Sequence, residues 1–79
     1  MASTSITSFS KDYSNKRFSL SISGNNNYTF YFSPSDLNSS FNDSVSYNSD
    51  AIMVGTATYS IDDLLKIAKN IYPNFQLPF

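Results

Sequence analysis

The adjacent carboxylates Asp62 and Asp63 come closest, in type and spacing, to residues that could perform acid–base chemistry. Catalytic acids, bases and nucleophiles must lie within hydrogen-bond reach of one another or of the substrate. Neighbouring residues of a helix do not face each other, and a helix N-terminus stabilises carboxylates, so both residues have a structural explanation. The many serines lack an imidazole base because the chain contains no histidine. We therefore expect no catalytic residue and a protein that is not an enzyme.

Oxygen-bearing side chains concentrate between residues 36 and 50, where they could hold a cation. They are Asp36, Asn38, Asn42, Asp43, Asn48 and Asp50. Calcium prefers such ligands, but the order of an EF-hand loop and its closing glutamate are missing. Turns in which Asp or Asn side chains bond the local backbone explain the composition more simply. Without histidine or cysteine for zinc, we expect no metal and no cofactor, and the sequence leaves cation binding by this loop open.

Three of the cationic residues lie near a tyrosine, which is a pattern that could bind single-stranded nucleic acid. Lys11, Lys16 and Arg17 cluster around Tyr13, and Tyr31 is a second ring expected on a sheet surface. Bases stack on such rings while cations follow the phosphates. The net charge of −1 and the pI of about 4.8 argue against this partner, because nucleic-acid binding needs a basic face. We keep it as the alternative function.

The last residues of the chain are apolar at every second position. Phe75, Leu77 and Phe79 alternate with polar residues or proline. Tyrosine and phenylalanine supply large contact areas at little entropic cost. We therefore predict that these three residues, with the exposed rings Tyr31 and Tyr13, bind a partner protein. The sequence does not decide whether the tail belongs to the core or to an interface.

A β-hairpin over residues 17–32 is the clearest element in the first half of the chain. Apolar and polar residues alternate on both sides of Gly24 and the three asparagines that follow it. Side chains of a strand alternate between its two faces, so this pattern predicts one buried and one exposed face. Gly and Asn favour a tight loop between the strands. The expected buried face consists of Phe18, Leu20, Ile22, Tyr28, Phe30 and Phe32.

An amphipathic helix over residues 60–72 is the clearest element in the second half. Ser60 is a good N-cap, Asp63 follows at capping-box spacing, and Pro73 ends the pattern. The apolar residues recur at helical spacing and form one wide stripe. They are Ile61, Leu64, Leu65, Ile67, Ala68, Ile71 and Tyr72.

The middle of the chain predicts a short helical turn. Ser33 can cap it and Pro34 suits its first position. Leu37 and Phe41 are spaced to share one face of this turn. The pattern favours weaker strands over residues 5–10 and 45–47, and one longer strand over residues 51–59.

The composition favours one small α+β domain over residues 1–79. We expect three to five antiparallel strands, with the hairpin 17–32 central and the helix 60–72 packed on one face. Aromatic residues make up 16% of the chain and charged residues only 14%, whereas an average domain is about a quarter charged. No secretory signal or membrane-spanning stretch is recognised, which favours a cytoplasmic location.

This composition resembles the core of a protein interface. We expect a small non-enzymatic protein-binding module, such as an inhibitor, adaptor or assembly subunit, that occupies the surface of a partner. The partner is another protein or a second copy in a homodimer, with no membrane involved. A structural self-assembling subunit is a further alternative.

Overall fold

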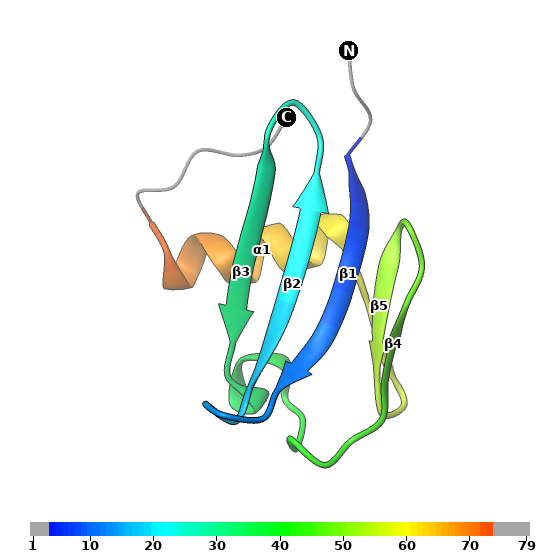
Figure 1. Cartoon of the computed structure of the whole chain (residues 1–79), viewed down its shortest axis with the longest axis vertical. Coiled ribbons are helices and arrows are strands. Elements are labelled where there is room, and N and C mark those ends of the chain that lie inside the picture. The colour runs from blue at the N-terminus through cyan, green and yellow to red at the C-terminus, as the bar shows by residue number, and fades with distance from the viewer. Residues whose placement is uncertain (1–3, 74–79) are drawn as a thin grey trace.

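The alternating segments of the first half form one antiparallel sheet. The structure is a computed structural model, and it describes residues 4–73. Strands β1 (Ser5–Asp12), β2 (Arg17–Ser23) and β3 (Asn27–Phe32) lie in the order β1-β2-β3, as Figure 1 shows. The predicted hairpin is therefore confirmed, with β2 at the centre of its sheet and β3 at one edge.

The two faces of this sheet differ as the alternation predicts. The inner face is apolar, with Phe18, Leu20 and Ile22 buried in β2, and Phe30 and Phe32 buried in β3. The outer face pairs small hydroxyl side chains across the strands. We call this outer surface the hydroxyl face, and it consists of Ser8, Ser10, Ser19, Ser21, Ser23 and Thr29.

A second antiparallel sheet is built from the shorter strands that follow. Strands β4 (Val45–Tyr47), β5 (Ala51–Val54) and β6 (Ala57–Ser60) lie in the order β4-β5-β6. The expectation of one strand over residues 51–59 is wrong, because the chain turns at Gly55 and pairs β6 with β5. Gly55 has a φ of 60°, a left-handed conformation that glycine adopts without the steric cost of a Cβ.

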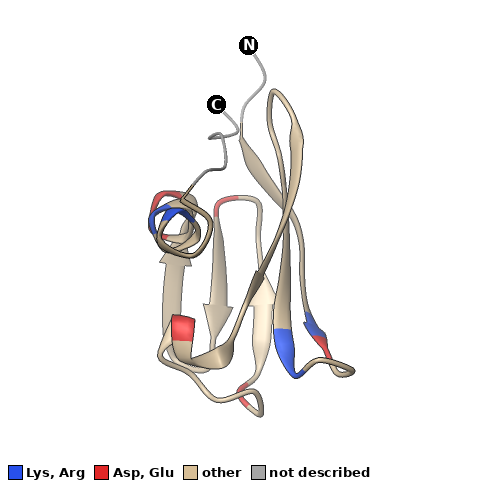
Figure 2. Cartoon of the chain, turned by 90° about the vertical axis from the view of Figure 1, so that its left-hand side faces the viewer, with Lys and Arg blue, Asp and Glu red and all other residues tan. Residues whose placement is uncertain are grey.

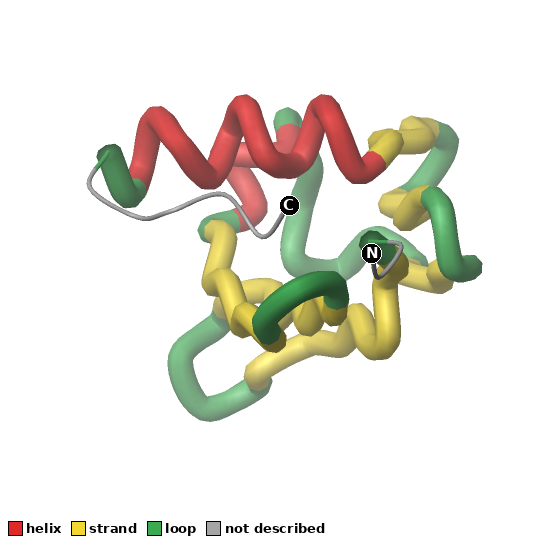
Figure 3. The backbone as a smooth tube through the Cα atoms, turned by 90° about the horizontal axis from the view of Figure 1, so that it is seen from above, coloured by secondary structure: helices red, strands yellow, loops and turns green. Residues whose placement is uncertain are grey.

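The amphipathic pattern at the end of the described chain forms helix α1 (Ile61–Ile71). Ser60 caps it, since its hydroxyl oxygen accepts from the Asp63 backbone N–H at 3.3 Å. Leu64, Leu65 and Ala68 are buried against the sheets. Figure 3 shows the helix as one layer lying across the inner face of the strands. The predicted α+β architecture is confirmed, with two sheets of three strands in place of a single sheet.

The two sheets meet along β1 and β4. The Ile6 N–H donates to the Ser49 carbonyl oxygen at 2.9 Å, and the Tyr47 hydroxyl donates to the Thr7 carbonyl oxygen at 3.1 Å. One cluster of buried side chains spans both sheets and the helix. Its members are Ile6, Phe9, Phe18, Leu20, Ile22, Phe30, Phe32, Leu37, Ile52, Val54, Leu64, Leu65 and Ala68.

The predicted helical turn is a 3₁₀ helix, η1 (Pro34–Leu37), which connects the two sheets. The Asp36 carboxylate accepts from the Ser33 N–H at 2.9 Å, which closes its first turn. Leu37 is fully buried, and its carbonyl oxygen accepts from the Tyr59 hydroxyl at 2.6 Å. Within residues 4–73 there is no helix of the length and apolar character needed to cross a membrane.

Candidate functional site

Basic and aromatic side chains gather at one end of the first sheet, around the turn that joins β1 to β2. Figure 2 shows Lys and Arg colouring at this lower end of the molecule, with an acidic residue beside it. We call this surface the basic–aromatic end. It consists of Lys11, Tyr13, Lys16, Arg17, Tyr31 and Phe41.

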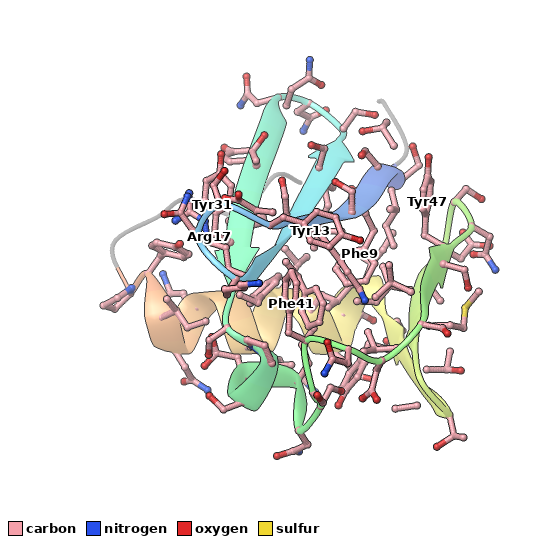
Figure 4. All side chains as sticks on the ribbon, turned by 60° about the horizontal axis from the view of Figure 1, so that its bottom comes forward. Phe9, Tyr13, Arg17, Tyr31, Phe41 and Tyr47 are labelled. Atoms are coloured by element: carbon pink, nitrogen blue, oxygen red, sulfur yellow. The ribbon has the colours of Figure 1, made fainter. Side chains whose placement is uncertain are left out.

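Phe41 lies at the centre of this surface (Figure 4). One side of its ring stacks on the buried Phe18, with centroids 5.8 Å apart and planes 14° apart. Tyr13 meets it at right angles, with centroids 5.4 Å apart and an interplanar angle of 88°. The ammonium groups of Lys11 and Lys16 lie 5.3 and 5.4 Å from its centroid, within the range of cation–π attraction. Phe41 therefore connects the two lysines and Tyr13 to the core.

Arg17 and Tyr31 form the second part of the basic–aromatic end. The guanidinium carbon of Arg17 lies 3.9 Å from the Tyr31 ring centroid, and its Nε donates to the Asp12 carboxylate at 3.0 Å. The side-chain amide of Asn15 also donates to that carboxylate, at 2.9 Å. These hydrogen bonds, first from Asn15 and then from Arg17, lower the pKa of Asp12, because they favour the charged carboxylate.

The two sequence-predicted tyrosines are exposed as expected. Tyr13 is 68% exposed and Tyr31 is 38% exposed. Both rings are nevertheless held by neighbours, Tyr13 by Phe41 and Tyr31 by Arg17. A ring that is already positioned loses little freedom when a partner covers it.

Lys16 completes the turn in an unusual backbone conformation. Its φ is 55°, in the left-handed region that costs a residue with a side chain roughly 1 kcal/mol. This conformation ends the turn of residues 13–16 and precedes β2. It accompanies the placement of the Lys16 ammonium over Phe41.

The structure brings together most of the residues that the sequence singled out. Lys11 and Lys16 meet Tyr13 through Phe41, and Arg17 meets Tyr31 directly. The predicted contacts Phe75, Leu77 and Phe79 lie outside the described residues.

Sequence reasoning missed Phe41 as part of this site. Its spacing placed it on the same face as Leu37, but η1 ends at Leu37 and the left-handed Asn38, with a φ of 50°, turns the chain away. An isolated large aromatic residue within a polar stretch was the signal that could have identified it.

The candidate catalytic residues have structural roles. Asp62 and Asp63 are exposed in the first turn of α1, where carboxylates complement the helix dipole. A Ser-x-x-Lys spacing, which the sequence reasoning missed, occurs at Ser8 and Lys11. Their cross-strand partners show that they lie on opposite faces of β1, because Ser8 pairs with Ser21 and Lys11 with the buried Phe18. This lysine is therefore not placed to activate Ser8.

The Asp- and Asn-rich loop uses its oxygens to hold its own backbone. Asp43 accepts from the Ser40 N–H at 3.0 Å, and Asn48 accepts from the N–H groups of Asp50 and Ala51 at 2.8 and 2.9 Å. The interpretation of this composition as turn chemistry is confirmed. Residues 4–73 contain no group of three acidic side chains arranged to hold a metal ion.

The chain was also compared with known proteins. No family model, curated protein or solved structure matches it.

Proposed function

We propose that this chain is a small non-enzymatic protein-binding module whose basic–aromatic end occupies the surface of a partner protein. The observation that carries the proposal is the position of Tyr13, which is 68% exposed and whose ring meets the Phe41 ring at right angles. Interface hot spots are enriched in tyrosine and arginine, and this surface presents both. An inhibitor, an adaptor and an assembly subunit would all act in this way.

The charges indicate what the partner surface carries. Within residues 4–73, neither Lys11 nor Lys16 forms an ion pair with a carboxylate, whereas Arg17 pairs with Asp12. Two ammonium groups near one ring repel each other, and a carboxylate between them would relieve that repulsion. We infer that the partner presents aspartate or glutamate beside an apolar patch that covers Tyr13.

The same charges make this surface a poor site for a symmetric homodimer. A two-fold contact places each patch against its own copy, so the lysines of both copies would come together. A homodimer that uses other surfaces stays a prediction, and so does a structural self-assembling subunit. The cytoplasmic location also stays a prediction. Light scattering over a range of concentrations tests both forms of self-association.

Site-specific crosslinking tests the proposed function. A photoreactive phenylalanine analogue at position 13 is compared with the same group at Thr58, an exposed position on β6. We expect the probe at Tyr13 to capture a protein in extracts of the source cells, and the probe at Thr58 not to capture it. The double change Lys11→Gln and Lys16→Asn, which keeps a residue that tolerates the left-handed backbone, should reduce capture about tenfold. Equal capture from both positions, or no loss on removing the lysines, contradicts the proposal.

Single-stranded nucleic acid remains the second candidate. Lys11 and Lys16 lie near the half-buried Phe41, which contacts the exposed Tyr13, and Arg17 lies against Tyr31. An oligothymidylate titration separates the two. Nucleic-acid affinity should fall steeply as salt rises, because bound counterions are released from the phosphates. Saturable, salt-sensitive binding that requires Tyr13 and Tyr31 would favour this second function over the first.

A further inference from the structure

A groove lies at the outer edge of β3, beside the last turn of α1. Its volume is about 330 Å³, and Tyr28, Thr29, Phe30, Tyr31 and Tyr72 line it. The Tyr72 ring centroid is 6.2 Å from that of Phe30, and its hydroxyl donates to the Tyr31 carbonyl oxygen at 3.3 Å. Figure 1 shows α1 crossing behind the first sheet and ending beside β3.

The backbone of β3 presents hydrogen-bonding groups to this groove. The Tyr31 carbonyl points away from β2, because it accepts from Tyr72. On the opposite side of β2, the Ser21 carbonyl points toward β1, since it accepts from the Thr7 hydroxyl. Ser21 pairs with Thr29. In an antiparallel ladder the groups of such a pair either both face each other or both face away. Because the Ser21 carbonyl faces β1, the N–H and C=O groups of Thr29 face the outer edge, and those of Tyr31, two residues further on, do the same. This edge can accept another strand.

The apolar stripe of α1 is covered unevenly along its length. Leu64, Leu65 and Ala68 are buried, while Ile71 and Tyr72 at the end of the helix are each 37% exposed. Tyr72 lines the groove and therefore borders the place where a further strand beside β3 would lie. Its inward side chains would cover apolar surface on both the helix and the sheet.

The sequence that follows Pro73 matches this edge in pattern and length. Residues 74–79 number six, as do the residues of β3. Their alternation puts the apolar residues on one face of an extended strand, and puts Asn74, Gln76 and Pro78 on the other. Proline lacks a backbone N–H, so Pro78, next to the end of this segment, would leave at most one hydrogen bond of the new ladder unmade.

We propose that residues 74–79 of the same chain pair with the outer edge of β3 as a fourth, antiparallel strand, with Phe75, Leu77 and Phe79 over the groove. The chain reaches the groove at Tyr72, beside Tyr31, so a strand continuing toward Tyr28 runs opposite to β3. The tether gives the tail an effective concentration on the order of millimolar at this site, which favours it over a foreign strand. The proposal is independent of the function proposed above, and it assigns the three tail residues to the fold instead of to the partner.

Amide hydrogen exchange of the full chain and of a chain ending at Pro73 tests this proposal. We expect the amides of Thr29 and Tyr31 to exchange at least about tenfold more slowly in the full chain, since a new strand would bond them. The amides of Leu20 and Phe30 face the centre of the sheet and report whether the shortened chain is folded. Equal exchange of Thr29 and Tyr31 in two folded chains overturns the proposal.

Point variants of the full chain keep the test valid if the shortened chain does not fold. Leu77→Asn should accelerate exchange at Thr29 and Tyr31 about tenfold, whereas Gln76→Asn on the opposite face of the tail should not. Nuclear Overhauser contacts between the Leu77 methyl groups and the Phe30 or Tyr72 ring should be present in the parent chain. Light scattering shows whether the strand comes from the same chain or from a second copy. If the protein is a dimer and these contacts are lost on dilution, a second copy supplies the strand, and pairing within one chain is overturned.

Discussion

Individual side chains of this protein connect its exposed surface to its core. Phe41 stacks on the buried Phe18 and contacts Tyr13, Lys11 and Lys16 from the other directions. A partner that contacts Tyr13, Lys11 or Lys16 therefore meets side chains that pack against a ring held by the core. The residues themselves could be selected from the sequence by type, but Phe41 could not, because its position depends on the direction in which the chain leaves η1.

The first prediction concerns Asp12, whose pKa is lowered by hydrogen bonds from Asn15 and Arg17. A carboxyl whose pKa is lower in the folded chain stabilises the fold above its unfolded pKa, near 3.9, and this contribution is lost as the pH falls toward the folded pKa. Between about pH 5 and about pH 3, Asp12→Asn should therefore lose less unfolding free energy than the parent chain. Urea unfolding at both pH values measures this difference.

Asn15→Ala provides the control for this prediction. It keeps the carboxylate and removes the largest cause of the lowered pKa. The unfolding free energy that it loses between the two pH values should therefore lie between the losses of the parent chain and of Asp12→Asn. Equal losses of unfolding free energy in the parent chain and in Asp12→Asn would show that these hydrogen bonds do not couple the protonation of Asp12 to folding.

The regular elements follow local patterns, and their boundaries follow local chemistry. The alternation of β2 and β3 and the helical spacing of α1 gave the correct elements. Most residues of the predicted buried faces are buried or partly buried, but Ile71 and Tyr72 at the end of the helix are each 37% exposed. The pairing of the short strands could not be predicted in the same way. Residues 51–59 contain enough apolar residues for one strand, and only the left-handed backbone at Gly55 divides them into a hairpin. The joining of β1 to the second sheet is a long-range arrangement with no local signal.

The second prediction concerns the N-terminus of α1. Ser60→Ala removes the oxygen that accepts from the Asp63 N–H, and should reduce the free energy of unfolding by about 1 kcal/mol. Chemical denaturation measures the loss. Ser46→Ala, the same change at an exposed strand position, serves as the control, and an equal loss in both variants would argue against a capping role.

At the scale of the whole molecule, a shared core joins two small sheets. Ile6 and Phe9 come from the first sheet, Ile52 and Val54 from the second, and Leu64 from the helix, yet they form one buried cluster. A chain this short has a marginal core, and the two sheets share theirs with the helix. Because both sheets bury their inner faces in the same cluster, we expect them to fold together.

The third prediction tests this coupling with Ile52→Val. Ile52 is completely buried, and removing one methylene group should cost about 1 kcal/mol. Amide signals of Ser21 in the first sheet and Met53 in the second should report the same loss and the same urea midpoint. A lower midpoint at Met53 alone would mean that the sheets unfold separately.

The hydroxyl face has a consequence for protein engineering. Its paired side chains, such as Ser10 with Ser19 and Ser21 with Thr29, are small and lie on the side of the sheet away from the buried cluster. Substitutions there leave the inner packing unchanged, and bulkier residues would project from a rigid three-stranded platform. The protein is therefore suited as a cysteine-free scaffold for combinatorial libraries, with new recognition surfaces selected on this face and the opposite side retained for folding.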